Sequence, residues 1–487
     1  MIDEEAVRRG RLDKLRASGI DPYPARSERT HDVREFLKSF DALAEAGTPV
    51  SLCGRVKTKR KHGGLTFCQF EDGSGIVQIA FRKDKLGEDG YAFLHETLDN
   101  GDLLEVRGTA FRTKAGEQTL DTQQYRMLAK TLLPLPEKWH GLSDVETRYR
   151  EREIDLIANK HVRNIFSTRA AILRSMRSYL DEHGFLEVET PVLQSVPGGA
   201  SAKPFMTHHN ALDADMYLRI APELYLKRCV VGGLERVYEV ARCFRNEGID
   251  HAHNPEFTQI EGYAAYMDYV QLMTFIEAML QHVIRSCGLD PAAVPFQGQM
   301  LDFSKITRQT FRDAVLAHAK IDIETLTSRD AASKAAVKMG VPVQPSDGIS
   351  TIIDNIYKHH VRPKIVQPTY LMDYPAEMTP LAKRKTENPG YVEMFQLVYG
   401  GGVENVKAFT ELNDPIDQEQ RFAEQESARE RGDEEAQFGD KEYVRALKHG
   451  LPPTAGFGIG IDRLTATLTD SHNLKEVILF PTLRPET

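Results

Sequence analysis

The sequence predicts an α+β protein made of a small N-terminal β-barrel domain and a larger domain of mixed strands and helices. The chain has 487 residues, more than one hydrophobic core normally supports, so at least two domains are expected. From Pro49 to about Leu132, short alternating runs joined by Gly- and Asp-containing turns predict strands. Beyond that region, patterns at helical spacing alternate with short strands, which favours a mixed domain.

Composition places the chain among globular proteins. It is 41% hydrophobic and 27% charged, and no run approaches the ~18 apolar residues of a membrane span. The start, "MIDEEAVRRGRLDKLRASG", lacks the apolar segment of a signal peptide, so we expect a cytoplasmic protein without a membrane anchor. Five cysteines without CxxC spacing indicate reduced thiols.

Residues 1–48 read as a charged helical leader to the barrel. The strand runs are "VSLCGRVKTKR", "LTFCQFEDGSGIVQIAFR", "DLLEVRGTAFRT" and "EQTLDTQQYRML", with "EDGSG" as the strongest turn. About five strands of this length predict a small closed barrel of the oligonucleotide-binding (OB) kind.

The net charge of -9 is uneven, with about +1 on residues 1–150 and about -10 on the remainder. The segment "GRVKTKRKHGG" brings together Arg55, Lys57, Lys59, Arg60 and Lys61. It is either a solvated hairpin edge or a surface that contacts phosphates. Phe67 and Gln78 nearby favour binding of single-stranded nucleic acid, by base stacking beside a charged groove.

The stretch "LLPLPEKWHGLSDVETRYRER" reads as a linker, so we divide the chain into domains at 1–148 and 149–487. A helix is expected from about Val162 to His183 with Gly184 at its C-cap, followed by a strand, "FLEVETPVL", interrupted by Pro191. Residues 269–362 show mostly helical patterns without identifiable chemistry. "QEQRFAEQESARERGDEEAQ" predicts a solvated helix.

The densest polar cluster is "RVYEVARCFRNEGIDHAHNPEFTQIEGYAAY", two strands around a turn-rich loop. Glu239 and Arg245 share one face of the first strand, and Phe257, Gln259, Glu261 and Tyr263 share one face of the second. An arginine, a ring and a carboxylate on one face could clamp an anionic ligand with a flat base. The alternative is a sheet edge of solvated ion pairs.

Two further strands enter helices. "GLPPTAGFGIGIDRLTATLTD" lacks the P-loop and dinucleotide-binding patterns, and its glycines permit close packing under a ligand near Arg463. In "GGGVENVKAFTELNDPIDQ", alternation places Asn405, Lys407, Phe409 and Glu411 on one face.

From about residue 50 to the C-terminus, these motifs resemble the class II aminoacyl-tRNA synthetases, and within them the class IIb lysyl-tRNA synthetases. The lysine-type signatures are "LPLPEKWHGLSDVETRYRER", "PGGASAKPF", "YLRIAPELYLKRCVVGG", "HNPEFTQIEGY" and "ELNDPIDQ". The resemblance implies an anticodon-binding OB-fold barrel, a class II synthetase antiparallel sheet flanked by helices, and a homodimer formed around Pro191.

The implied activity is that of a lysine–tRNA ligase. L-lysine is activated with ATP and Mg2+ to lysyl-adenylate, which is transferred to the 3′ end of tRNA(Lys). Two alternatives stay open. One is a paralogue that transfers lysine or an analogue to a non-tRNA acceptor such as a protein lysine, although such relatives generally lack the barrel. The other is a non-catalytic nucleic-acid-binding protein, which the motif around Arg245 and Arg463 disfavours.

The resemblance also implies residue roles. The catalytic residues are Arg245 and Arg463. The anticodon-reading positions are Arg60, Phe67, Gln78 and Glu117. The ATP-binding residues are Arg245, Glu247, His253, Asn254, Phe257 and Arg463. The lysine-binding residues are Gly199, Glu223, Glu261, Tyr263, Lys407, Phe409 and Glu411. Among these, Glu261, Tyr263 and Glu411 match the group that holds the ε-ammonium, where carboxylates replace lost water.

The sequence departs from the family pattern at the expected metal site. Glu404 matches one of two metal-bridging glutamates, but Gln396 stands where the other is usual, and Lys407 stands where asparagine is usual. These two changes add about two positive charges. They are either drift that keeps a hydrogen-bond donor, or a sign that Lys407 takes over work of one metal ion, or a mark of a changed acceptor or amino acid.

Overall fold

The computed structural model describes residues 3–136, 142, 144–200, 202–430 and 438–485, and it divides into two compact units, Met1–Ser143 and Asp144–Thr487. Trp139 in the predicted linker and the end of the predicted solvated helix, 431–437, lie outside these residues. Within the described residues, no helix has both the length and the apolar character needed to cross a membrane.

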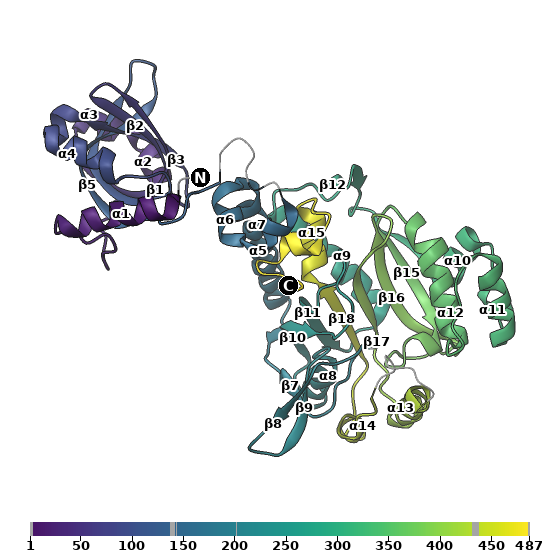
Figure 1. Cartoon of the computed structure of the whole chain (residues 1–487). Helices are drawn as coiled ribbons and strands as arrows, with labels where there is room; N and C mark the ends of the chain where they lie inside the picture. The colour runs from purple at the N-terminus through teal and green to yellow at the C-terminus, as the bar shows by residue number, and fades with distance from the viewer. Residues whose placement is uncertain (1–2, 137–141, 143, 201, 431–437, 486–487) are drawn as a thin grey trace. The chain divides into compact units, whose positions relative to one another are not determined.

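The first unit is the predicted closed barrel, with strand order β1-β2-β3-β5-β4 (Figure 1). The strands are β1 (Val50–His62), β2 (Leu65–Glu71), β3 (Ile76–Arg82), β4 (Leu103–Arg112) and β5 (Gln118–Ala129). Alternate residues such as Leu52, Phe70 and Ile79 point inward and are buried, as strand periodicity requires. Three short helices, α1 (Glu4–Ala17), α2 (Val33–Lys38) and α3 (Phe40–Ala46), form the predicted helical leader.

The sequence did not reveal helix α4 (Lys83–Thr97), which lies between β3 and β4 of the barrel. Its helical pattern is broken at Gly87, which adopts φ 75° and joins two shorter helices across a kink. Gly87 and Gly90 also weaken helix propensity. The prediction of continuous β structure across this stretch was therefore wrong.

The second unit is built on an eight-stranded sheet of order β14-β15-β16-β17-β18-β11-β10-β6. Only the end pairs, β14–β15 and β10–β6, are parallel, so the predicted class II antiparallel sheet is confirmed. The strands are β6 (Leu186–Glu187), β10 (Arg236–Phe244), β11 (Glu256–Ala265), β14 (Thr307–Thr310), β15 (Thr369–Pro375), β16 (Tyr391–Tyr399), β17 (Val403–Thr410) and β18 (Thr454–Gly460). The predicted strand around Pro191 is reduced to β6 and β7 (Leu193–Gln194), and β7 pairs with the hairpin of β8 (Met206–His209) and β9 (Ala214–Leu218).

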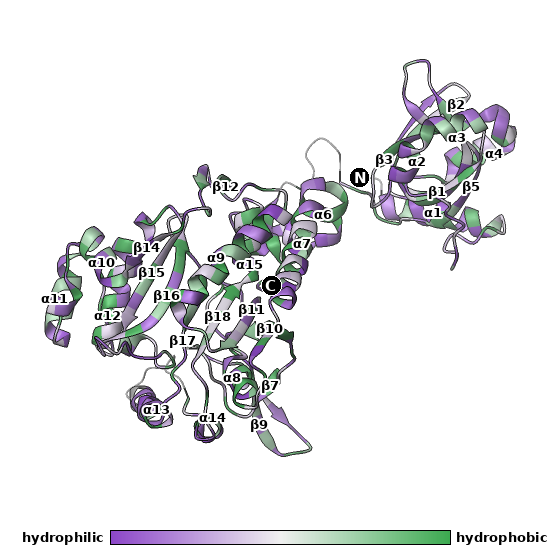
Figure 2. Ribbon diagram, turned by 180° about the vertical axis from the view of Figure 1, so that it is seen from behind, coloured by the Kyte–Doolittle hydropathy of each residue, from purple (hydrophilic) through white to green (hydrophobic). Residues whose placement is uncertain are grey.

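Hydrophobic cores cover both faces of this sheet, because successive side chains of a strand point to opposite sides. Tyr263 and Phe409 belong to one core, whereas Ile260 and Ala408 belong to the other. In Figure 2 the strands of the sheet carry both hydrophobic and hydrophilic residues, whereas α13 is coloured mainly hydrophilic. The longer helices are α7 (Lys160–Glu182), α8 (Glu223–Val231), α9 (Tyr269–Ser286), α10 (Phe311–Ala319), α11 (Arg329–Lys338), α12 (Ile349–Ile356), α13 (Pro415–Glu430) and α15 (Ile461–Leu468). Shorter elements are α5 (Val145–Arg150), α6 (Arg152–Ala158), α14 (Lys441–Leu447), α16 (Leu474–Val477), β12 (Val294–Phe296) and β13 (Gln299–Leu301).

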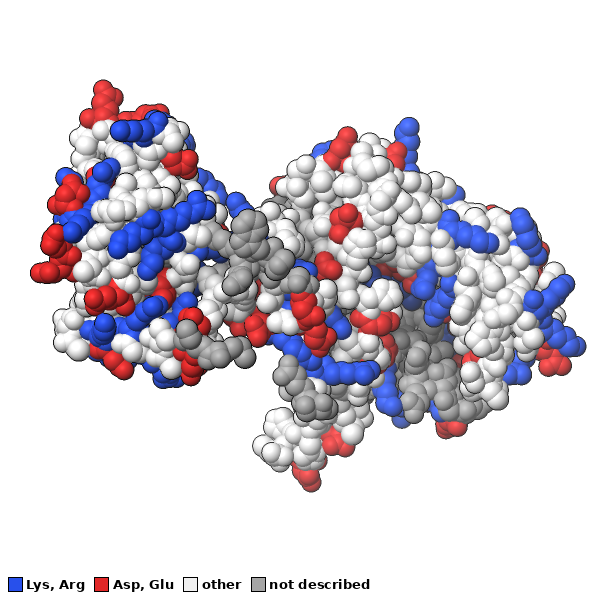
Figure 3. Space-filling view, turned by 45° about the horizontal axis from the view of Figure 1, so that its top comes forward, with Lys and Arg blue, Asp and Glu red and all other residues white. Residues whose placement is uncertain are grey.

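The basic segment of β1 serves two purposes. Arg55 donates to the Gly101 carbonyl, Lys57 pairs with Glu71 at 3.1 Å, and Lys59 donates to the Leu98 carbonyl, so these three help to hold the barrel. Arg60 and Lys61 at the end of the strand are exposed. Figure 3 shows lysine and arginine side chains gathered on one face of the barrel unit. A surface for phosphates can therefore involve only part of the segment.

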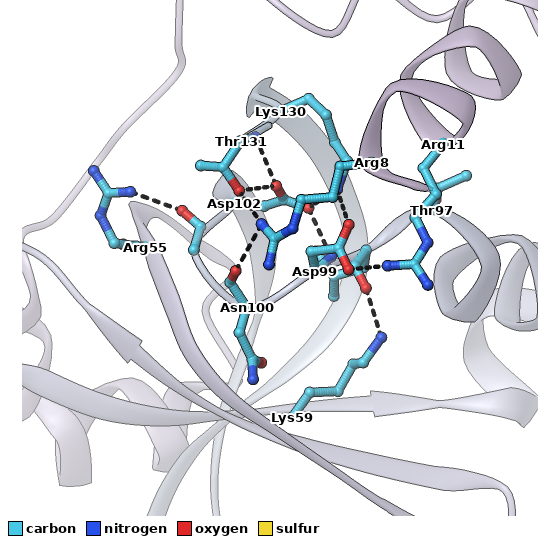
Figure 4. A network of polar contacts seen from close by, with 12 residues as sticks. Arg8, Arg11, Arg55, Lys59, Thr97, Asp99, Asn100, Asp102, Lys130 and Thr131 are labelled. Atoms are coloured by element: carbon cyan, nitrogen blue, oxygen red, sulfur yellow. Dashed lines mark hydrogen bonds and ion pairs between the residues drawn. The ribbon is translucent and has the colours of Figure 1, made fainter. Parts of the chain in front are cut away.

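A buried ion network fastens helix α1 to the barrel (Figure 4). The Lys130 ammonium lies between Asp99 and Asp102, with Nζ to carboxylate oxygen distances of 2.5 and 2.7 Å. Arg8 of α1 donates to the Asn100 carbonyl at 3.2 Å and to the Thr131 hydroxyl at 2.8 Å, and Arg11 pairs with Asp99. Buried charges of this kind need such partners, which explains why the leader is ordered on the barrel.

Candidate active site

One cavity of about 940 Å³ lies on the sheet face that carries Glu261 and Tyr263. With one exception, the residues predicted to bind ATP, lysine and metal all line it: Gly199, Glu223, Arg245, Glu247, His253, Asn254, Phe257, Glu261, Tyr263, Gln396, Glu404, Lys407, Phe409 and Arg463. The exception is Glu411, which is fully buried behind the wall. Segments far apart in sequence are thus brought to a single site, while the individual roles stay predictions.

One end of the cavity is acidic. Glu261 and Tyr263 project together from β11, and the Tyr263 hydroxyl donates to Glu261 at 3.2 Å while the Gln259 amide donates to its other oxygen. Burial, together with the nearby Glu223 carboxylate, raises the pKa of Glu261 to about 8. This carboxyl therefore holds a proton at neutral pH until a cation reaches it.

Sequence reasoning missed Lys227, a fully buried cation at this end. Its ammonium lies 2.6 Å from Glu223 Oε1 and also pairs with Glu411 Oε2. Burial alone would lower the pKa of Lys227, but the Glu223 and Glu411 carboxylates outweigh it and raise the pKa. The available signal was spacing, because Glu223 and Lys227 are four residues apart on α8 and so share a helix face.

Two glycines keep this end open. A Cβ on Gly456 of β18 would lie 2.3 Å from both Glu411 Oε1 and Tyr263 Cε1, so any side chain there would displace the cluster. Gly199 has φ 87°, and a Cβ there would lie 2.8 Å from Glu223 Cβ. The Gly-rich strand therefore forms the floor of the acidic end. Its glycines were predicted to allow close packing, and Gly456 also makes room for the acidic cluster itself.

Cationic side chains line the cavity as well. Arg245 Cζ lies 5.0 Å from the centroid of the Phe257 ring, and Arg463 donates to the Glu404 carbonyl at 2.6 Å. Burial lowers the pKa of Arg463, although an arginine stays charged at neutral pH. Glu239, predicted to share a strand face with Arg245, pairs with Arg219 and accepts from Thr190, so its charge is neutralised within the fold.

The loop between β10 and β11 supplies two polar side chains with partners of their own. His253 Nδ1 lies 2.9 Å from Asp250, and both residues are exposed. The Asn254 amide donates to the Glu256 carbonyl, and its oxygen accepts from the backbone of Thr482. Asn254 therefore ties the loop to the C-terminal segment as well as lining the cavity.

The expected metal site contains one carboxylate. Glu404 accepts from the Tyr357 hydroxyl at 3.0 Å and lies 3.5 Å from Arg362, while the Gln396 oxygen accepts from the Tyr374 hydroxyl at 2.8 Å. The Lys407 side chain is exposed in the cavity and forms no ion pair or hydrogen bond with any described residue. The Asn405 amide, 4% exposed on the same strand face, is likewise without a partner in the described chain.

The positions predicted to read the anticodon lie on the barrel. Arg60 of β1 and Phe67 of β2 are cross-strand partners, and Gln78 of β3 pairs with Gln69 of β2. The Gln78 amide donates to Thr119 near the start of β5, two residues after the exposed Glu117. These side chains therefore occupy neighbouring strands of one barrel surface.

A closed OB barrel and an antiparallel sheet that carries a large cavity indicate the class of protein. Residues 50–133 match the family described as OB-fold nucleic acid binding domain, and residues 144–484 match the tRNA synthetases class II (D, K and N). The protein is thus a class II tRNA synthetase.

Full-length relatives narrow the family. A lysine–tRNA ligase of Pelotomaculum thermopropionicum is 47% identical over 483 residues, covering 98% of this chain and 94% of the relative. The ligases of Roseiflexus castenholzii and Moorella thermoacetica are 48% and 47% identical, covering 98% or more of each chain. The chain belongs to the lysine–tRNA ligase family.

Proposed function

We propose that the cavity activates L-lysine with ATP to form lysyl-adenylate, and that the chain then transfers the lysyl group to the 3′ end of tRNA(Lys). The observation that carries the assignment is that one cavity is lined both by the carboxylates of Glu223 and Glu261 and by the guanidinium groups of Arg245 and Arg463. Lysine with two ammonium groups fits the first, and the triphosphate fits the second.

In this proposal, Glu261 and Tyr263 receive the ε-ammonium, Glu411 adds negative charge from behind the cavity wall, and Phe409 packs along the aliphatic stem. Gly199 and Glu223 receive the α-amino group. The substrate carboxylate, held by Arg245, attacks the α-phosphorus of ATP in line. A P–O bond forms as the bond to pyrophosphate breaks, and the electron pair leaves with pyrophosphate.

The chain supplies charge and position in this step, and no side chain acts as nucleophile. Arg245 and Arg463 stabilise the charge that develops on the phosphate oxygens, and Phe257 stacks on the adenine. The adenylate is then attacked by a terminal ribose hydroxyl of the tRNA, and AMP leaves. Glu247, His253 and Asn254 complete the nucleotide site.

One Mg2+ ion fits the cationic end. Mg2+ is usually held by one or two carboxylates together with substrate phosphates. Glu404 offers such a carboxylate, whereas the Gln396 oxygen is already bonded to Tyr374. Within the described ranges, no three His, Cys, Asp or Glu side chains gather as a ligand set. Glu404 and ATP oxygens would hold the ion, which neutralises phosphate charge when bound.

The position of Lys407 supports the hypothesis that the reaction needs less Mg2+ than is usual. Its ammonium lines the cavity together with Arg245 and Glu404, and it stands beside a neutral glutamine where a second carboxylate is usual. We assign it to an oxygen at the junction of amino acid and phosphate, where it does the work of a metal ion as a fixed cation.

The proposal includes a homodimer in the cytoplasm. Leu186, Val192 and Leu193, which flank Pro191, are 51%, 39% and 43% exposed, as expected of an apolar surface that a second copy covers. The five cysteines, all within the described chain, form no disulfide and suit a reducing compartment.

The decisive experiment is amino-acid-dependent ATP–pyrophosphate exchange across all twenty amino acids, followed by aminoacylation of tRNA(Lys). We expect lysine alone to stimulate exchange strongly. Exchange that does not respond to lysine would overturn the assignment, and exchange without aminoacylation would favour a non-tRNA acceptor. Light scattering at micromolar concentration tests the dimer.

A further inference from the structure

We propose that Lys227 is a positioning residue that sets the charge of the amino-acid pocket to match a substrate carrying two ammonium groups. The inference rests on the proposed lysine pocket and deepens it. Lys227 does not line the cavity and is fully buried, so it acts through the carboxylates that it contacts and not on the substrate.

The charges at this end of the cavity balance when lysine is added. Three carboxylates converge there, Glu223, Glu261 and Glu411, and one ammonium, Lys227, lies among them. Once a substrate ammonium displaces the proton of Glu261, the three carboxylates and the Lys227 ammonium leave two negative charges. Free lysine presents two ammonium groups to them, and its carboxylate faces Arg245.

The geometry shows how one internal ammonium serves two recognition groups. Lys227 Nζ forms an ion pair with Glu223 Oε1 at 2.6 Å. The other oxygen, Glu223 Oε2, faces Gly199 and would lie 3.6 Å from a Cβ added to that glycine. Lys227 also pairs with Glu411, a fully buried carboxylate. It therefore fixes the carboxylate proposed for the α-amino group and a second carboxylate that lies behind the wall of the ε-ammonium pocket.

The surroundings hold Lys227 as a buried cation. Its ammonium lies 5.3 Å from the Phe409 ring centroid, 5.8 Å from that of Tyr443 and 5.9 Å from that of Tyr263. Aromatic faces stabilise a desolvated ammonium. Two of these rings, Phe409 and Tyr263, also line the cavity, so displacement of Lys227 would disturb the walls that face the substrate stem.

Without Lys227, three buried carboxylates would face one another. Such a cluster takes up protons, because burial and like charges both disfavour ionisation. Each bound proton must leave before a substrate ammonium can replace it, so lysine binding weakens while ATP binding at the other end is unaffected.

The test uses the full-length protein in lysine-dependent ATP–pyrophosphate exchange. We expect Lys227→Met to raise KM for lysine at least about tenfold and to leave KM for ATP within about twofold, as for removal of one partner of a buried charge pair. The matched control is Lys130→Met, which removes an equally buried lysine with two carboxylate partners from the barrel. The control should lose stability but keep KM for lysine.

A charge-repair variant separates pocket charge from mere structural support. Glu411→Gln alone leaves one net negative charge, whereas Lys227→Met/Glu411→Gln restores two. Adding Lys227→Met to Glu411→Gln should therefore lower KM for lysine at least about threefold, a gain that loss of support cannot produce. This comparison also decides the matter if Lys227→Met alone does not fold.

Two outcomes overturn the inference: a folded Lys227→Met variant whose KM for lysine equals that of the wild type, or a double variant that binds lysine no better than Glu411→Gln. They differ from failure of the proposed function, in which the unaltered protein shows no lysine-dependent exchange. The pH profile adds a second readout, because KM for lysine in Lys227→Met should fall more steeply between pH 7 and 9 than in the wild type.

Discussion

Gln396 and Lys407 are direct cross-strand partners on β16 and β17, and both side chains line the cavity. A neutral amide therefore lies beside an ammonium at the point where phosphates are expected. The Gln396 oxygen is bonded to Tyr374, and Lys407 has no ion-pair partner among the described residues, so the ammonium is available to a ligand. The two neighbouring residues together determine the charge at this point of the site.

Replacement of Lys407 by asparagine should increase the need for metal. We expect Lys407→Asn to raise the Mg2+ concentration for half-maximal pyrophosphate exchange about fivefold, since a charge at contact distance in water is worth about 1 kcal/mol. Calorimetry of ATP binding in EDTA should show weaker binding. Lys358→Asn is the matched control, because Lys358 lines the same cavity but is paired with Asp354 at 2.7 Å. An unchanged metal dependence in Lys407→Asn would refute the role.

Gly456, in the floor of the acidic end, should not accept even the methyl side chain of alanine. A Cβ there would lie 2.3 Å from Glu411 Oε1, so Gly456→Ala should lower the stability of the catalytic unit by about 1–3 kcal/mol and raise KM for lysine. At Gly458 the nearest atom, Glu261 Cγ, lies 3.6 Å from the added Cβ, an ordinary contact. Thermal unfolding of Gly456→Ala and of the control Gly458→Ala measures the difference. Equal losses of stability in the two variants would contradict the prediction.

Lysine binding should weaken as the pH falls below 8. The pKa of Glu261 is raised to about 8 in the free protein, so the carboxyl is protonated below that pH and ionised above it. Because the ε-ammonium needs the ionised form, KM for lysine should rise by up to about tenfold for each pH unit below 8 and level off above it. KM for ATP measured over the same range is the control, and a flat lysine profile would contradict the prediction.

The barrel and the antiparallel sheet could be predicted because strand periodicity and turn residues are local signals. The cavity lining could be predicted only through whole motifs, since Glu223, Glu261 and Glu404 lie on separate segments of the chain. Periodicity did place Lys407 and Phe409 on one strand face correctly, and both line the cavity. It could not show that Glu411, on the same face, lies behind the wall.

Features that depend on long-range contacts were beyond the sequence. Lys227 resembles any amphipathic helix residue until Glu411, 184 positions away, closes its ion pair. Likewise, spacing placed Glu239 on one strand face with Arg245, but Arg219 neutralises it from another segment. Charge partners decide the role of such residues, and spacing along one strand does not reveal them.

The barrel surface should affect tRNA recognition without affecting lysine activation. Phe67 is half-buried beside Arg60, its cross-strand partner, so Phe67→Ala should weaken binding of tRNA(Lys) by about 1–3 kcal/mol, as expected for loss of one stacked base. Arg60→Ala should reduce the slope of log affinity against log salt by about one unit, as expected for loss of one phosphate contact. The control is Phe111→Ala on β4, where the ring packs against Arg82 at 5.0 Å and is likewise half-buried. Filter binding across a salt series measures both effects, and pyrophosphate exchange without tRNA should be the same in all variants.

A Phe67→Ala variant that binds tRNA(Lys) as tightly as Phe111→Ala would remove Phe67 from the interface, and an Arg60→Ala variant with an unchanged salt slope would show that this guanidinium contacts no phosphate.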